Sequence, residues 1–117
     1  MQAEQYRIEN ENEILSPALI YYADKIRENT RRTIEIAGGA ARLWPHVKSH
    51  KMRAMLEMQM EMGIRRFKCA TLAEAEMTAQ AGAEHILLAY PPAGPAAAAF
   101  VWLVLQYPQA QFSARAD

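Results

Sequence analysis

Apolar and polar residues follow two different periods along the chain. Short apolar or alternating runs, typical of strands, stand at 19–23 (LIYYA), 42–48, 66–70 (RFKCA), 85–90 (HILLAY) and 111–115. Longer stretches between them repeat apolar residues three and four positions apart, as amphipathic helices do. The pattern therefore predicts strands alternating with helices along the whole chain.

Capping and breaking residues set the expected ends of the helices. Asp24 is a candidate N-cap for the first helix, which Gly38 and Gly39 should stop. Thr71 and Glu74 have the spacing of a capping box at the start of the third helix. The four helices predicted in this way cover 25–37, 52–62, 71–82 and 95–107, the last opened by Pro95 and broken by Pro108.

This alternation favours right-handed crossovers and a parallel sheet. No Gly-rich phosphate fingerprint follows 19–23, which argues against a dinucleotide-binding fold. A (β/α)8 barrel needs about 250 residues, so this chain would hold about four and a half units. The expected fold is α/β, the N-terminal half of a TIM-type barrel, incomplete in this chain. We expect it to cover 17–117, after a polar segment at 1–16.

Composition narrows the class of function. Thirteen basic residues balance thirteen acidic ones, so no nucleic-acid partner is expected. The single Cys69 excludes an intrachain disulfide and a multi-cysteine zinc site. No signal-peptide pattern opens the chain, and the apolar run at 96–105 is shorter than the about 20 residues that span a bilayer. A cytoplasmic protein with no membrane partner is expected.

The segment 43–52 (LWPHVKSHKM) concentrates the candidate chemistry. Lys48 should lie at the carboxyl end of the second predicted strand, where barrel enzymes build their active sites. His46 and Lys48 are two apart and so should share a face of that strand. Partial burial, with positive charge from neighbours such as His50 and Lys51, favours a neutral amine, the form that makes a Schiff base.

Plainer interpretations of these residues remain open. A lysine in a loop after a strand is most often only a solvated charge. His46 and His50 have the spacing of helical zinc ligands, but Pro45 favours extended chain and no Glu stands at 47, so no metal site is expected. Cys69 at the end of a strand fits a small buried hydrophobe better than a nucleophile.

Four segments together resemble one family. SPALIYY, PHVKSHK, FKCATLAEAE and ILLAYPPAGP are similar to the N-terminal barrel part of the D-threonine aldolase and D-serine dehydratase group, within the alanine-racemase-like, fold type III pyridoxal-phosphate enzymes. The similarity runs from about Ile14 to the end of the chain. It implies that Lys48 is catalytic and holds pyridoxal phosphate as an internal aldimine. Lys48 and His46 are the expected cofactor-binding residues.

The resemblance also implies a lyase acting on a small D-amino acid. Aldol cleavage, dehydration and racemisation all remain open, because they differ only in which bond breaks and where a second acid or base stands. In the family, later barrel loops hold the phosphate and a carboxy-terminal β domain supplies metal ligands. A divalent metal would therefore belong to the full-length parent, with no ligands in this chain, and this chain alone should show little or no turnover.

The alternative is a non-catalytic or pyridoxal-phosphate-binding α/β module that self-associates. In either case the first and last strands should leave unpaired edges. The helix over 96–106 (AAAAFVWLVLQ) is too apolar for all of its faces to pack on one sheet. A homo-oligomer is therefore expected.

Overall fold

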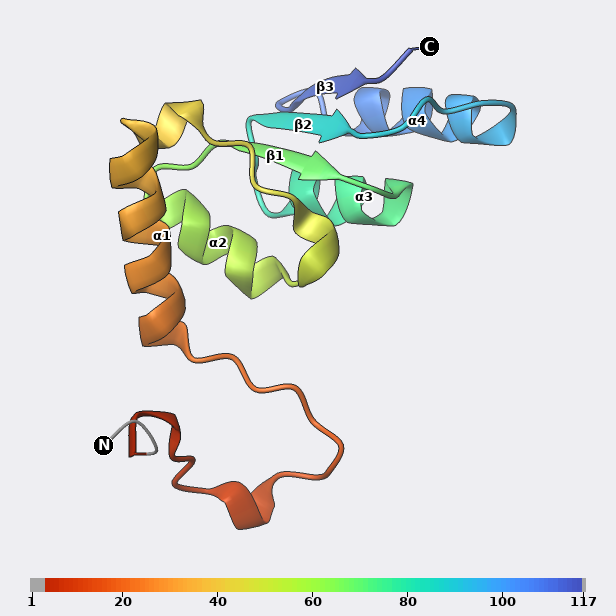
Figure 1. The fold of residues 1–117 in the computed structure, drawn as a ribbon. Coiled ribbons are helices and arrows are strands. Elements are labelled where there is room, and N and C mark those ends of the chain that lie inside the picture. Colours follow the sequence, from red (N-terminus) through yellow and green to blue (C-terminus); the bar gives the residue numbers. More distant parts are fainter. Residues whose placement is uncertain (1–3, 117) are drawn as a thin grey trace.

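A small parallel sheet organises the computed structural model, which describes residues 4–116 (Figure 1). Its strands pair in chain order, and all are parallel. His46 adds a single parallel bridge to Lys68, so the segment before it lies along the free edge of the first strand. The strands are β1 (Arg66–Cys69), β2 (His85–Leu88) and β3 (Gln111–Ala114).

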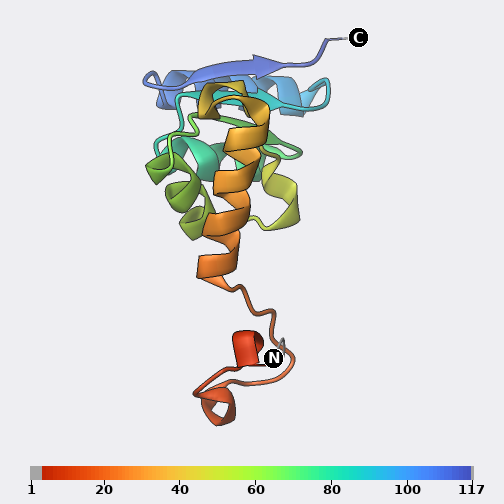
Figure 2. The same cartoon turned by 60° about the vertical axis from the view of Figure 1, so that its left-hand side comes forward.

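Helices connect the strands and cover one face of the sheet. Within residues 4–116 the α-helices are α1 (Ala23–Ala37), α2 (Arg53–Glu61), α3 (Leu72–Gln80) and α4 (Pro95–Gln106). Short 3-10 helices are η1 (Glu4–Tyr6), η2 (Glu11–Glu13), η3 (Ala40–Arg42) and η4 (Val47–Ser49). Helix α3 packs against β1, β2 and α4, and α1 packs against α2 and η3. The chain before α1 extends away from this body in both views (Figures 1 and 2).

The core lies between the sheet and its helices. Phe67 and Cys69 of β1 are fully buried, and the residues that alternate with them are half-buried. The same alternation holds in β2. Because successive side chains of a strand point to opposite faces, one face of the sheet joins the core and the other stays more open. The core side chains include Leu56, Ile64, Ala75, Ala79, Ile86 and Leu103.

A capping box ties the end of β1 to the start of α3, as predicted. The Thr71 hydroxyl oxygen accepts a hydrogen bond of 3.1 Å from the Glu74 N–H. The Glu74 carboxylate accepts from the Thr71 hydroxyl at 2.9 Å and from the Ala70 N–H at 3.2 Å. Only 4% of Glu74 is exposed. The Glu74 carboxylate therefore stabilises the start of α3 and is shielded from solvent.

Most of the predicted elements are confirmed. The strands predicted over 66–70, 85–90 and 111–115 are present, each one or two residues shorter than expected. Pro95 opens α4, and Gly38 ends α1 in the left-handed conformation with φ 84°. The fold class is confirmed as well, since helices alternate with parallel strands. No helix of the described residues is both long and apolar enough to cross a membrane.

The strand predicted over 19–23 is wrong. Residues 19–22 form no strand, 77% of Leu19 is exposed, and α1 already begins at Ala23. No described strand pairs with this run, and an apolar run becomes a strand only where a neighbour takes its backbone hydrogen bonds. The N-cap of α1 is Tyr22, so the prediction for Asp24 is also wrong; Asp24 lies in the first turn.

The strand predicted over 42–48 is reduced to the bridge at His46. Helix η3 covers its first residue and η4 begins at Val47. The chain turns directly after this bridge, and the His46 ring accepts the Lys48 N–H within the turn. Lys48 therefore follows the first segment of the sheet rather than a second strand. The division between 1–16 and 17–117 stays a prediction.

Candidate functional site

Lys48 sits in η4, the turn between the sheet edge and α2. Helix η4 lies against β1, near the carboxyl end of that strand (Figure 1). Val47, directly before Lys48, is fully buried in the core. Lys48 itself is exposed. The backbone is thus anchored from one side while the amine stays accessible to a ligand.

The side chain of His46 stabilises this turn. Its Nδ1 accepts a hydrogen bond of 3.2 Å from the Lys48 N–H. Burial lowers the pKa of His46, and the positive charges of Lys48 and Lys68 lower it further, against an opposing effect of Glu74. The ring is therefore neutral at pH 7, with its proton on Nε2. The structure thus joins the two residues of the motif by a direct hydrogen bond rather than by strand alternation.

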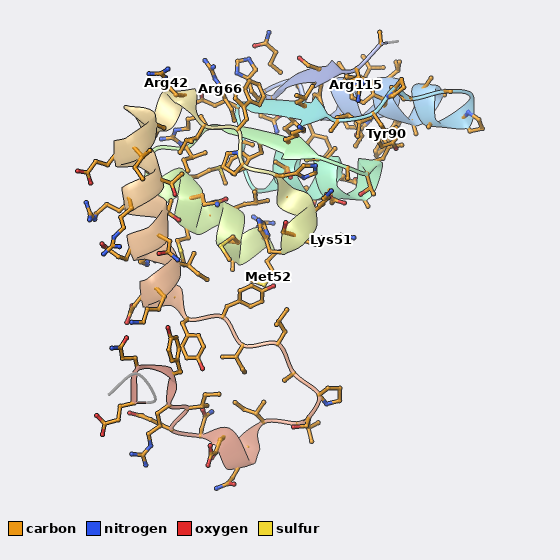
Figure 3. The ribbon with its side chains drawn as sticks, in the orientation of Figure 1. Arg42, Lys51, Met52, Arg66, Tyr90 and Arg115 are labelled. Atoms are coloured by element: carbon orange, nitrogen blue, oxygen red, sulfur yellow. The ribbon has the colours of Figure 1, made fainter. Side chains whose placement is uncertain are left out.

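His50, directly after η4, repeats this arrangement. Its Nδ1 accepts a hydrogen bond of 2.9 Å from the Met52 N–H. Its Nε2 is buried and, within the described residues, has no hydrogen-bond partner. Burial lowers the pKa of His50, with Glu74 opposing. His50 is therefore a neutral ring that supports the start of α2, while Lys51 between the two is exposed (Figure 3).

Lys68 is a second lysine on the open face of the sheet, and the sequence analysis did not single it out. It alternates with the buried Phe67 and Cys69, so its side chain lies on the face opposite the core. It is also the bridge partner of His46. The alternation within RFKCA was the available signal. That alternation places Lys68 on the face opposite the core, whereas its position beside His46 depends on the pairing of two distant segments.

The amino end of the open face is filled by a row of stacked side chains. The guanidinium of Arg66 lies 5.5 Å from the centroid of the Trp44 ring. The rings of Trp44 and His85 stack with centroids 5.8 Å apart. The His85 ring in turn contacts the side-chain amide of Gln111. Figure 3 shows Arg66 at the end of the sheet opposite to Arg115, so this row lies away from the carboxyl ends of the strands.

The lysines of the site lack acidic partners. No ion pair within residues 4–116 involves Lys48 or Lys68. Glu74, whose charge acts on the pKa of both His46 and His50, already accepts two local hydrogen bonds. The lysines at the carboxyl half of the open face therefore have no ion-pair partner, which favours an anionic ligand.

Cys69 behaves as the buried hydrophobe that was expected. It is fully buried, and burial raises the pKa of its thiol to about 11. Its Sγ lies 3.5 Å from the Thr78 hydroxyl. At neutral pH the thiol stays protonated and is a poor nucleophile. The described residues contain no group of three or more His, Cys, Asp or Glu side chains that could hold a metal ion.

A cavity of about 330 Å³ lies elsewhere, between α1, α2 and the segment before the bridge. Its walls are mostly apolar, and Ile26, Thr30 and Leu43 are among them. Neither Lys48 nor His46 lines it. It is therefore separate from the candidate site at Lys48 and His46.

The comparisons define the class of the protein. Residues 22–114 match the family described as alanine racemase, N-terminal domain, and the chain belongs to that family. The crystal structure of D-threonine aldolase from Filomicrobium marinum is similar, with 29% sequence identity and a TM-score of 0.79. The match covers 92% of this chain and 29% of the aldolase chain. No curated protein sequence matches this chain. The resemblance inferred from the four segments is thereby confirmed, as is the N-terminal part of an alanine-racemase-like barrel.

Proposed function

We propose that the chain is part of a pyridoxal-phosphate-dependent lyase acting on a small D-amino acid, with Lys48 as the lysine that holds the cofactor. One observation carries the proposal. Lys48 presents an exposed amine at the carboxyl end of a parallel sheet, on a turn anchored by buried Val47 and by His46. Active sites of barrel enzymes lie at this end of the strands.

The residues present fit pyridoxal phosphate. Members of this fold family generally bind that cofactor. The cofactor carries an aldehyde, which needs an accessible amine, and a phosphate, which needs positive charge. Lys48 offers the first, and the positive charge of Lys48 and Lys68 offers the second. The neutral His46 ring accepts a hydrogen bond from the Lys48 N–H and so lies beside these two lysines.

Each residue has a distinct task in this proposal. Pyridoxal phosphate, when bound, supplies an aldehyde carbon and a ring that accepts electrons from the amino acid Cα. Lys48 would hold the cofactor through its amine and, once released by the incoming amino acid, would carry a proton to or from that amino acid. His46 keeps the backbone of Lys48 in one position. A fixed backbone reduces the entropy lost when the reacting atoms meet.

The similarity to D-threonine aldolase supports part of the proposed reaction type. Similarity to D-threonine aldolase favours cleavage of the Cα–Cβ bond of a β-hydroxy D-amino acid. Loss of water from D-serine is the nearest alternative, since both reactions begin at the same Cα. The chain spans 29% of the length of that aldolase. A homo-oligomer and a cytoplasmic location stay predictions.

Covalent trapping tests the proposal directly. The chain is incubated with pyridoxal phosphate, reduced with borohydride and cleaved, and the labelled peptide is identified by mass spectrometry. We expect the label on Lys48, its loss in Lys48→Ala and its retention in the control Lys51→Ala. A label confined to Lys51 or Lys68 would overturn the assignment. A label on Lys48 with no spectral response to D-threonine or D-serine would support the non-catalytic module instead.

A further inference from the structure

Lys68 and His46 face each other across the sheet edge. They are partners in a parallel bridge, and the Lys68 N–H donates a hydrogen bond of 2.9 Å to the Pro45 carbonyl. Paired residues of neighbouring strands carry their side chains on the same face. The contacts of Trp44 with Arg66 and His85 show the same face, two residues toward the amino end. Lys68 therefore lies on the open face, level with His46 and two residues before the level of Lys48.

Both lysines act on the same imidazole. The positive charges of Lys48 and Lys68 each lower the pKa of His46, after the larger effect of burial. The geometry agrees, since Lys68 is the bridge partner of His46 and the Lys48 N–H donates to the His46 ring. The two lysines reach His46 from different segments of the chain, one from η4 and the other from β1. The bridge and the His46 ring thus bring Lys48 and Lys68 to the same part of the open face.

Neither lysine of this pair has an ion partner among the described residues; Glu74, whose charge also acts on the His46 ring, accepts hydrogen bonds at the start of α3 instead. Arg66 on the same face differs, because it rests on the Trp44 ring. Two cations held together on a half-buried face repel each other, and an anion placed between them relieves that repulsion.

We propose that Lys68 is a second binding residue of this site, whose ammonium holds an oxyanion of the molecule that Lys48 binds. The inference rests on the proposed function for the identity of that molecule. Its oxyanion is either the phosphate of pyridoxal phosphate or the carboxylate of the amino acid. Both present charged oxygens that a lysine binds by charge-assisted hydrogen bonds.

Inorganic phosphate tests the anion site without the cofactor. The chain is treated with a limiting amount of acetic anhydride, with and without phosphate, and acetylation of each lysine is followed by peptide mapping. We expect phosphate to slow acetylation of Lys68 by about threefold or more, because the bound anion occupies the amine. Lys25 and Lys51 serve as internal controls and should react unchanged. If phosphate leaves the acetylation rate of Lys68 unchanged, as it should leave that of Lys51, the proposal is overturned.

Variants then separate the two sources of the oxyanion. Binding of pyridoxal phosphate and of pyridoxal is titrated for Lys68→Met, Lys68→Arg and the charge control Lys51→Met. If Lys68 holds the phosphate, Lys68→Met weakens pyridoxal phosphate by about tenfold and leaves pyridoxal unchanged, and Lys68→Arg restores binding. If it holds the carboxylate, both cofactor forms bind normally to Lys68→Met. The loaded variant then needs about tenfold more D-threonine for its spectral response.

The failure of either proposal can be recognised. Lys68→Met matching Lys51→Met in every titration would mean that Lys68 holds no ligand, even with Lys48 correctly assigned. Lys48→Ala binding pyridoxal phosphate as tightly as the unchanged chain would end the proposed function. In that case protection of Lys68 by inorganic phosphate still decides whether an anion site exists there.

Discussion

The imidazole of His46 accepts, at Nδ1, a hydrogen bond of 3.2 Å from the backbone N–H of Lys48. One side chain thereby ends the sheet at this edge and starts the 3-10 turn that carries the amine. The position of Lys48 depends on this bond from the His46 side and on buried Val47 from within η4.

Removing the ring should loosen this turn. We expect His46→Ala to lower the free energy of unfolding by about 1 kcal/mol, because the Lys48 N–H loses its acceptor. It should also slow labelling of Lys48 by pyridoxal phosphate. His46→Asn is the matched control, since its side-chain oxygen can accept the same bond. Urea denaturation and labelling rates measure both effects, and equal losses in the two variants would show that the hydrogen bond is unimportant.

Stability should fall as the solution becomes acidic. Burial holds the pKa values of His46 and His50 below their ordinary 6.5 in the folded chain. Below pH 6.5 the unfolded chain therefore binds more protons than the folded one, and stability decreases as the pH falls from 6.5 toward the folded pKa values. Urea midpoints at pH 7.5 and pH 5 measure this change. His50→Asn keeps an acceptor for the Met52 N–H and should reduce the difference; an unchanged difference in a variant lacking both rings would contradict this account.

The start of α3 should depend on one hydroxyl. Thr71→Ala removes the acceptor of the Glu74 N–H and the donor to the Glu74 carboxylate. We expect a loss of about 1 kcal/mol in the free energy of unfolding. Thr71→Ser keeps the hydroxyl and should cost much less. Thermal or urea denaturation of the three proteins gives the comparison, and the prediction fails if serine is as costly as alanine.

Exposed apolar side chains on α4 should mediate self-association. Trp102 is 51% exposed and Leu105 72% exposed, on a helix that contacts α3 by its other side. Contiguous exposed apolar surface of this kind marks a contact site or an aggregation hazard. We expect Leu105→Glu to shift the chain toward monomer in sedimentation at micromolar concentration. Gln106→Glu adds the same charge at a polar position, and it should leave association unchanged; a monomer in the unsubstituted chain would refute the expectation.

Elements with local signals could be predicted from the sequence. The strands around Phe67 and Ile86 alternate buried and half-buried residues, and the capping box of Thr71 and Glu74 marks the helix between them. The run at 19–23 has the same composition as a strand but no partner in the described residues. Strand formation depends on that partner, which local sequence does not contain. The strand predicted over 19–23 is therefore wrong because the run lacks a pairing partner, although its composition is that of a strand.

The candidate site was predicted in part. Lys48 and His46 were singled out from the motif PHVKSHK, and the structure joins them by a hydrogen bond. That bond arises in a 3-10 turn, whereas strand alternation had been expected, and it could not be derived from spacing alone. The position of Lys68 beside His46 was not predicted, because it depends on a pairing between distant segments.

The order of the strands in space is their order in the chain, from the segment at His46 through β1 and β2 to β3. A polypeptide leaves the ribosome from its N-terminus, so each new strand meets an edge that already exists. Among the described strands, none has to wait for a later one or be inserted between two finished neighbours. The edge that carries Lys48 therefore leaves the ribosome before β3 does, and within this sheet it precedes β3 in assembly.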